Sequence, residues 1–190
     1  MSRQEKYGDS NPVVRFVIRR FFAGIGNVVA GLMPESVLDA GSGEGELLRR
    51  GVLRPGVRTV CLDRSLDALA EAPSPDRVCG LVDALPFKTG SFDVVLCMEV
   101  LEHLPQPAAA VSELARVARK AVVLSVPHEP YFRMGNVLRG KHLGGFGNHP
   151  EHVQHWNIAS FGAFLSPTFP ETKIIEAFPW IIACCRLKQR

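Results

Sequence analysis

The sequence predicts a three-layer α/β/α sandwich built on a mostly parallel, seven-stranded sheet. Short apolar segments alternate along the chain with helical patterns, which is typical of parallel strands connected by helices over both faces of a sheet. The length of 190 residues suits one domain, and a hydrophobic fraction of 46% is enough for one core. Only Phe178-Pro179 separates the last two apolar segments, so we expect the sheet to end in an antiparallel hairpin.

The first predicted element is a helix over Pro12–Leu32, where apolar residues recur at helical spacing and a proline suits the first turn. Basic residues interrupt the apolar pattern at Arg15, Arg19 and Arg20. A helix lying on a membrane surface is therefore one interpretation, because basic and aromatic residues mix there. We favour the other interpretation, in which residues 1–32 carry a helix that covers the core.

The remaining elements follow in alternation, with strands at short apolar runs and helices where apolar residues recur every three to four positions. The predicted strands are Ser36–Ala40, Arg58–Leu62, Val78–Val82, Phe92–Cys97, Ala121–Val126, Thr172–Ala177 and Trp180–Leu187. The predicted helices are Glu44–Arg50, a short helix capped by Ser65 and running to Ala70, Pro107–Ala118, and Ser160–Leu165. In such a sheet, ligands bind outside the carboxyl ends of the strands.

Composition restricts the class of protein. A formal net charge of +3 neither requires nor excludes RNA as a partner. The five cysteines are odd in number, form no CxxC pair and lie mostly in apolar runs, which is typical of reduced thiols. No apolar run reaches the roughly 18 residues of a membrane span, and the N-terminus has no signal-peptide core. We therefore expect a cytoplasmic protein without an integral membrane segment.

A glycine-rich loop follows the first predicted strand. Residues 37–45 read VLDAGSGEG, so an acidic strand end runs directly into glycines that let the backbone turn sharply and approach a ligand closely. A dinucleotide fingerprint GxGxxG would need glycine where Glu46 stands, which disfavours an NAD-dependent dehydrogenase. The candidate ligand-binding residues of this loop are Asp39, Gly41, Ser42, Gly43 and Gly45.

A second acidic residue ends the second predicted strand. Asp63 follows Gly43 at the spacing of roughly 20 residues at which a carboxylate accepts hydrogen bonds from ribose hydroxyls. The alternative is an aspartate that merely precedes the helix cap at Ser65. The strand context favours the ribose interpretation.

The segments DALPF (residues 83–87) and GSFDVVLCMEVLEH (residues 90–103) resemble class I S-adenosylmethionine-dependent methyltransferases. The glycine loop is similar to motif I of that family, and the likeness runs from about Ser36 to Pro127. It is greatest to small-molecule enzymes of the ubiquinone and menaquinone pathways. The resemblance implies a Rossmann-like fold and S-adenosylmethionine as cofactor. It assigns Asp83, with Ala84, to the adenine, and Cys97 and Met98 to the methionine part of the cofactor. From the residues alone, Asp83 is equally a turn residue.

A possible cation site lies in the pattern E-x-x-E-H formed by Glu99, Glu102 and His103. In the opening turn of a helix all three side chains would share one face, and two carboxylates with an imidazole suit Mg²⁺ or another divalent cation. The pattern resembles the metal-binding ExxEH of ubiquinone-pathway O-methyltransferases and of small-RNA 3′-terminal 2′-O-methyltransferases. In the latter a further histidine precedes a tryptophan, as His152 precedes Trp156 here. The alternative is that the helix dipole favours these acids at an N-terminus.

Residues 128–159 follow the fifth predicted strand, where a loop can lie over the cofactor as a substrate lid. Most histidines of this segment are expected to be solvated, and His128 and His152 are the candidate catalytic bases. We expect a single domain over residues 1–190 that transfers a methyl group to an oxygen of a small-molecule acceptor. The alternatives are a metal-free C- or N-methyltransferase acting on a lipophilic small molecule, and a non-catalytic cofactor-binding regulator.

Overall fold

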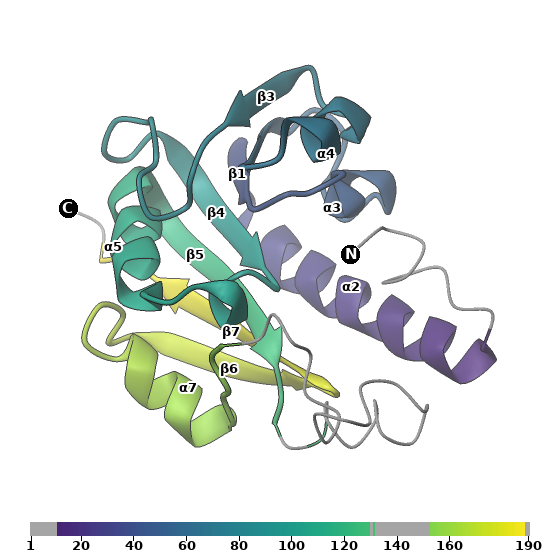
Figure 1. Cartoon of the computed structure of the whole chain (residues 1–190), viewed down its shortest axis with the longest axis vertical. Coiled ribbons are helices and arrows are strands. Elements are labelled where there is room, and N and C mark those ends of the chain that lie inside the picture. Colours follow the sequence, from purple (N-terminus) through teal and green to yellow (C-terminus); the bar gives the residue numbers. More distant parts are fainter. Residues whose placement is uncertain (1–10, 130, 132–152, 189–190) are drawn as a thin grey trace.

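The computed structural model describes residues 11–129, 131 and 153–188. Seven strands form one sheet in the order β3-β2-β1-β4-β5-β7-β6 (Figure 1). The strands are β1 (Ser36–Ala40), β2 (Arg58–Asp63), β3 (Asp76–Cys79), β4 (Phe92–Met98), β5 (Ala118–Pro127), β6 (Thr172–Ala177) and β7 (Trp180–Arg186). The helices are α2 (Pro12–Leu32), α3 (Glu46–Arg49), α4 (Leu66–Glu71), α5 (Pro107–Val117) and α7 (Ile158–Leu165), with a 3₁₀ turn η1 (Leu101–His103). The predicted fold class is confirmed.

The strand order reverses beside β1. From β1 the chain builds outward through β2 to β3, and it then returns to place β4 on the other side of β1, with all these pairings parallel. A crevice forms outside the carboxyl ends of the strands at such a reversal, which is where open α/β sheets bind ligands. The fold therefore places the glycine-rich loop after β1 at the expected binding edge.

The predicted terminal hairpin is confirmed, and its second strand lies inside the sheet. β7 pairs antiparallel with β5 on one side and with β6 on the other, so β6 reaches the sheet only through β7. On the face of the sheet under α2, the ring of Phe21 packs against that of Trp180, with centroids 4.5 Å apart. The N-terminal helix therefore packs directly on the last strand.

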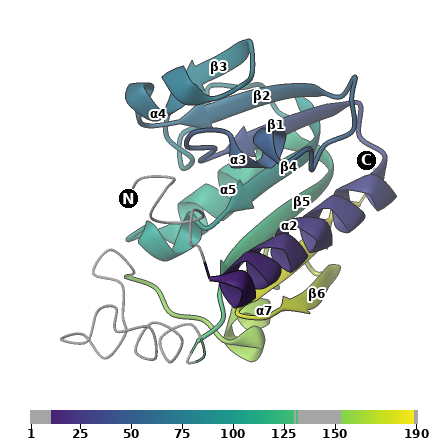
Figure 2. The same cartoon turned by 90° about the vertical axis from the view of Figure 1, so that its right-hand side faces the viewer.

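Two hydrophobic clusters fill the two faces of the sheet. One contains the buried side of α2, whose side chains at positions 18, 21, 22, 25 and 29 repeat at helical spacing and pack with Leu47 of α3. The other contains Leu114 of α5 and Phe161 of α7, both fully buried. Figure 2 shows α2 and α5 on opposite sides of the strands. Each face of the sheet thus has its own helical layer.

Several predicted boundaries differ from the structure by one to three residues, and two of the differences have clear physical reasons. The third strand is Asp76–Cys79 rather than Val78–Val82, because it is an exposed edge strand and the buried Val82 belongs to the turn that follows. The helix after the glycine loop begins at Glu46 rather than Glu44, because Gly45 takes a left-handed conformation with φ 74° and ends the loop. Among the helices that the structure describes, none has the length and apolar character needed to cross a membrane.

Candidate functional site

The glycine-rich loop is hydrogen-bonded to the end of β2. The backbone N–H groups of Gly41 and Ser42 both donate to the carbonyl oxygen of Leu62, at 2.7 and 2.9 Å. The N–H of Gly45 then donates to the carbonyl of Ser42 at 2.9 Å and closes the turn. Short backbone hydrogen bonds of this kind fix the conformation of the loop.

The three loop glycines have different reasons to be glycine. Gly41 and Gly45 are packed tightly: a Cβ on Gly41 would overlap Val100, and one on Gly45 would lie 2.7 Å from Cδ of Pro73. Gly43 is different, because at φ 53° its Cβ would meet no atom within 4 Å. Gly43 therefore borders open space that a side chain would fill, as expected where a ligand approaches the backbone.

Asp63 faces this open position. Its carboxylate oxygen Oδ2 accepts a hydrogen bond from the N–H of Gly43 at 2.8 Å, and Oδ1 accepts one from the N–H of Ser65 at 2.9 Å. Ser65 also caps α4, since its hydroxyl accepts from the N–H of Ala68. The strand-end acid and the glycine loop thus form one unit. Each carboxylate oxygen keeps a second lone pair that can accept a hydrogen bond from a ligand hydroxyl.

Asp39 lies beneath the loop as a buried carboxyl group. It is 3% exposed, and burial, with the nearby charge of Asp63 as a smaller cause, raises the pKa of Asp39 to about 7. Burial also raises the pKa of the thiol of Cys61, on the neighbouring strand, to about 11. The thiol of Cys61 is therefore neutral in the physiological range and is no nucleophile, whereas Asp39 changes its protonation state within that range.

We expect Asp39→Asn to flatten the pH dependence of stability. Because the folded protein keeps the Asp39 proton up to a pKa of about 7 and the unfolded chain releases it near 3.8, stability falls as pH rises between these values. Asparagine imitates the protonated acid and removes this loss. Melting temperatures measured without ligand should differ most at about pH 8, by several degrees in favour of the variant, and converge near pH 4. Parallel curves would contradict the raised pKa.

The predicted adenine residues lie in the turn that follows β3. Asp83 and Ala84 are exposed in a turn in which the N–H of Ala84 donates to the carbonyl of Leu81 at 3.3 Å. The turn starts from Gly80, whose N–H donates to the backbone carbonyl of Asp63 at 3.0 Å. The structure therefore brings the predicted ribose and adenine residues to the same edge of the sheet.

Cys97 and Met98, at the end of β4, differ in how deeply their side chains are buried. The side chain of Cys97 is fully buried in the core cluster that includes α5, so only its backbone is available to a ligand. Met98 ends the strand and is partly buried. Of the two, only Met98 has a partly exposed side chain, and it packs against the core cluster under α2.

The prediction that E-x-x-E-H opens a helix was wrong. Glu99 follows β4 in the left-handed region with φ 57°, and Glu102 and His103 lie in the 3₁₀ turn η1. The buried carboxylate of Glu99 accepts hydrogen bonds from Ser125 Oγ at 3.1 Å and from Trp180 Nε1 at 2.6 Å. A buried carboxylate needs such donors, and they fix its orientation.

Glu102 and His103 do not complete a metal site with Glu99 in the described part of the chain. Glu102 is 1% exposed, and its Oε1 lies 3.9 Å from Nε2 of His103. Residues 11–129, 131 and 153–188 contain no group of three histidine, cysteine, aspartate or glutamate side chains placed to hold a metal ion. The fourth predicted ligand, His152, lies outside these residues.

His128 lies at the base of the predicted lid. It is 6% exposed, its backbone N–H donates to the carbonyl of Pro179 at 2.9 Å, and its ring packs edge-on against Tyr131. Its Nδ1 is 3.9 Å from Oε1 of Glu176 on β6. The structure thus places this candidate base against the terminal hairpin.

The two ends of residues 128–159 lie together. His128 forms a parallel bridge with Trp156, and the N–H of Glu129 donates to the carbonyl of Trp156 at 2.9 Å. The backbone carbonyl of Glu102 accepts from the N–H groups of Val153 and Gln154, at 2.9 and 3.1 Å. The described ends of this segment therefore lie side by side, next to η1. The rest of the predicted lid, with His152, lies outside the described residues.

The sequence did not reveal the partners of Glu99. Ser125 lies on β5 and Trp180 on β7, and 81 residues separate Trp180 from Glu99 along the chain. No local pattern links residues so far apart. A tryptophan at a strand start is the one available indication, because a buried indole N–H requires an acceptor.

Comparison with known proteins agrees with this geometry. Residues 38–126 match the methyltransferase domain family. The ubiquinone biosynthesis O-methyltransferase of Sodalis glossinidius is 36% identical over 98 residues, which cover 47% of this chain and 39% of that protein. Its counterpart in Methylococcus capsulatus is 28% identical over 148 residues, covering 66% and 62%. The chain thus spans about two fifths of the length of the first of these relatives.

The fold also has solved counterparts. Magnesium protoporphyrin IX methyltransferase from Synechocystis PCC 6803, solved with bound S-adenosylhomocysteine, superposes with a TM-score of 0.68. The alignment covers 97% of this chain and 92% of that one at 21% sequence identity. At this identity the likeness concerns the fold.

Proposed function

We propose that this chain is a class I S-adenosylmethionine-dependent methyltransferase that transfers a methyl group to an oxygen of a small-molecule acceptor, and the match of residues 38–126 to the methyltransferase domain family supports this. The oxygen acceptor is supported by the relatives, which are named as O-methyltransferases. The net charge of +3 gives no indication of an RNA acceptor.

One observation carries the cofactor part of the proposal. Gly43 borders open space at the strand reversal, and Asp63 holds its N–H at 2.8 Å while keeping lone pairs for a ligand. S-adenosylmethionine fits this arrangement, with the ribose hydroxyls on Asp63 and the chain of the methionine part passing over Gly43. Asp83 and Ala84 would contact the adenine, and Met98 the methionine part.

Bound S-adenosylmethionine would supply a methyl group made electrophilic by its sulfonium. The acceptor oxygen would form a C–O bond to this methyl carbon while the C–S bond breaks, so that S-adenosylhomocysteine would be the leaving group, and a base on this chain would take the hydroxyl proton. The chain must hold acceptor, methyl carbon and sulfur in line, which is where most of the rate gain arises. We propose His128 and His152 as the candidate bases, and residues 128–159 as the lid that carries the acceptor site.

The proposal is tested first by binding and then by turnover. Calorimetry should detect S-adenosylhomocysteine binding to the full chain, and absence of binding would remove the proposed function. Transfer of labelled methyl from S-adenosylmethionine to hydroxylated aromatic compounds should follow. Label found on carbon or nitrogen would contradict the oxygen acceptor, and binding without turnover on any acceptor would favour a cofactor-binding regulator.

The cation site of Glu99, Glu102, His103 and His152 stays a prediction, because His152 lies outside the described residues. The hydrogen bonds from Ser125 and Trp180 already orient the carboxylate of Glu99. If the site forms, EDTA should abolish turnover and leave S-adenosylhomocysteine binding intact. Adding Mg²⁺ or Mn²⁺ should then restore turnover. Full activity in EDTA would exclude the cation.

A further inference from the structure

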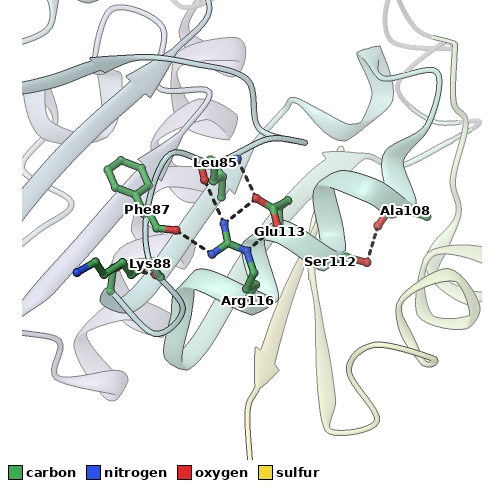
Figure 3. Close-up of polar contacts among 8 residues, drawn as sticks. Leu85, Phe87, Lys88, Ala108, Ser112, Glu113 and Arg116 are labelled. Carbon is green, nitrogen blue, oxygen red and sulfur yellow. Dashed lines mark hydrogen bonds and ion pairs between the residues drawn. The ribbon is translucent and has the colours of Figure 1, made fainter.

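A polar network joins α5 to the segment that follows β3 (Figure 3). Glu113 and Arg116 are three residues apart on one face of α5 and pair doubly: Arg116 Nε lies 2.6 Å from Oε1 of Glu113, and Nη2 lies 2.8 Å from Oε2. Two parallel charge-assisted hydrogen bonds hold both side chains in one orientation. We call this pair the α5 clasp.

The α5 clasp also forms hydrogen bonds with the backbone of the segment that follows β3. The N–H of Leu85 donates to Oε2 of Glu113 at 2.9 Å. Arg116 donates from Nη2 to the carbonyl of Leu85 at 3.0 Å and from Nη1 to the carbonyl of Phe87 at 2.8 Å. Arginine suits this role, because its planar fork of donors serves a carboxylate and two carbonyls at once.

The turn that carries Asp83 lies between this clasp and β2. On one side, Gly80 is hydrogen-bonded to the backbone carbonyl of Asp63 at 3.0 Å. On the other side, Leu85 is held by the clasp and its side chain is 5% exposed, within the core. Asp83 itself is exposed between the two anchors. Its position relative to Asp63 therefore depends on both ends of the turn.

Glu113 and Arg116 stabilise each other's charged forms. Hydrogen bonding from Arg116 lowers the pKa of Glu113, and hydrogen bonding to Glu113 raises the pKa of Arg116. Both side chains are partly covered, with exposed fractions of 24% and 34%. The clasp thus keeps its charges across the neutral range.

We infer that Glu113 and Arg116 are positioning residues for the cofactor, which hold Asp83 and Ala84 where they recognise the adenine. The inference rests on the proposed function. It assigns the clasp a role that differs from general stability, because a loosened turn would weaken recognition of the adenine amino group in particular.

The test compares two ligands that differ at that group, S-adenosylhomocysteine and S-inosylhomocysteine, in which an oxo group replaces the amine. The wild-type chain should prefer the adenine ligand. In Arg116→Gln we expect binding of S-adenosylhomocysteine to weaken by about tenfold, with little change for S-inosylhomocysteine. Asp83→Ala should lose the same preference, and adding Arg116→Gln to it should cause no further loss.

Matched variants separate positioning from stability. Arg119→Gln removes an ion pair of the same kind, since Arg119 Nη2 lies 2.8 Å from Oδ1 of Asp93, and in the described chain its side chain bonds only to Asp93 and Ser36. It should lower the melting temperature and keep the preference. Arg116→Lys keeps the charge without the fork and should restore part of the preference.

Each outcome has a distinct meaning. If Arg116→Gln changes the affinities for the two ligands by the same factor, or changes neither affinity, the clasp is only structural and the inference is overturned. A wild type that binds both ligands equally also overturns it, while the proposed function stands. A wild type that binds neither ligand overturns the proposed function as well.

Discussion

Gly43→Val is expected to abolish binding of S-adenosylhomocysteine while the domain stays folded. A Cβ at this position meets no protein atom within 4 Å, so the side chain would occupy only the open space at the loop. The branched side chain would fill the path of the ligand, and a valine would also strain the backbone of residue 43 at its φ of 53°. The strain alone should cost about 1–2 kcal/mol of stability, which a folded domain tolerates.

Gly56→Val is the matched control for this experiment. Gly56 has a positive φ of 87° and also meets no atom within 4 Å, but it lies in the turn before β2 rather than in the loop. Both variants should therefore lose similar stability in thermal unfolding, and only Gly43→Val should lose binding in calorimetry. Normal affinity in a folded Gly43→Val protein would mean that the loop is an ordinary turn.

Asp63→Ala is expected to weaken S-adenosylhomocysteine binding by roughly ten- to a hundredfold. Losing hydrogen bonds between a carboxylate and hydroxyl groups typically costs about 1.5–3 kcal/mol. The variant also releases the N–H of Gly43, which Asp63 holds at 2.8 Å, so the loop loses an anchor. Both effects act on affinity in the same direction.

Two further variants show how the result for Asp63→Ala is to be interpreted. Asp63→Asn keeps one acceptor oxygen and should fall between wild type and Asp63→Ala. Asp67→Ala removes an exposed carboxylate on neighbouring α4 and should bind as wild type does. Calorimetry in which Asp63→Ala retains full affinity would remove Asp63 from the binding site.

The parts of the fold that were predictable are those set by local chemistry. Apolar runs mark the buried strands, as in β4, where Val94, Val95, Leu96 and Cys97 are all fully buried. The loop was predictable because glycines cluster at a strand end and Asp63 follows at a regular spacing. The edge strand β3 was misplaced because its residues are mostly exposed, so no apolar run marks it.

Contacts between distant segments could not be predicted. Glu99 was expected in a helical turn on the strength of acidic spacing. The structure instead gives it a left-handed backbone and hydrogen bonds from Ser125 and Trp180, residues on two other strands. The α5 clasp was missed for a similar reason, since Glu113 and Arg116 read locally as an ordinary helical ion pair. Their backbone partner Leu85 lies 28 residues earlier than Glu113.

The position of β7 between β5 and β6 has a consequence for the order of assembly during synthesis. β6 leaves the ribosome before β7, yet it pairs only with β7 in the sheet, so it cannot dock until the strand behind it has emerged. The helix α2 is synthesised before β7, so the ring of Phe21 likewise lacks its contact with Trp180 until β7 has emerged. Part of the apolar surface of β5 and α2 therefore lacks its native partner until β7 has emerged, and exposed apolar surface of this kind favours aggregation of a nascent chain.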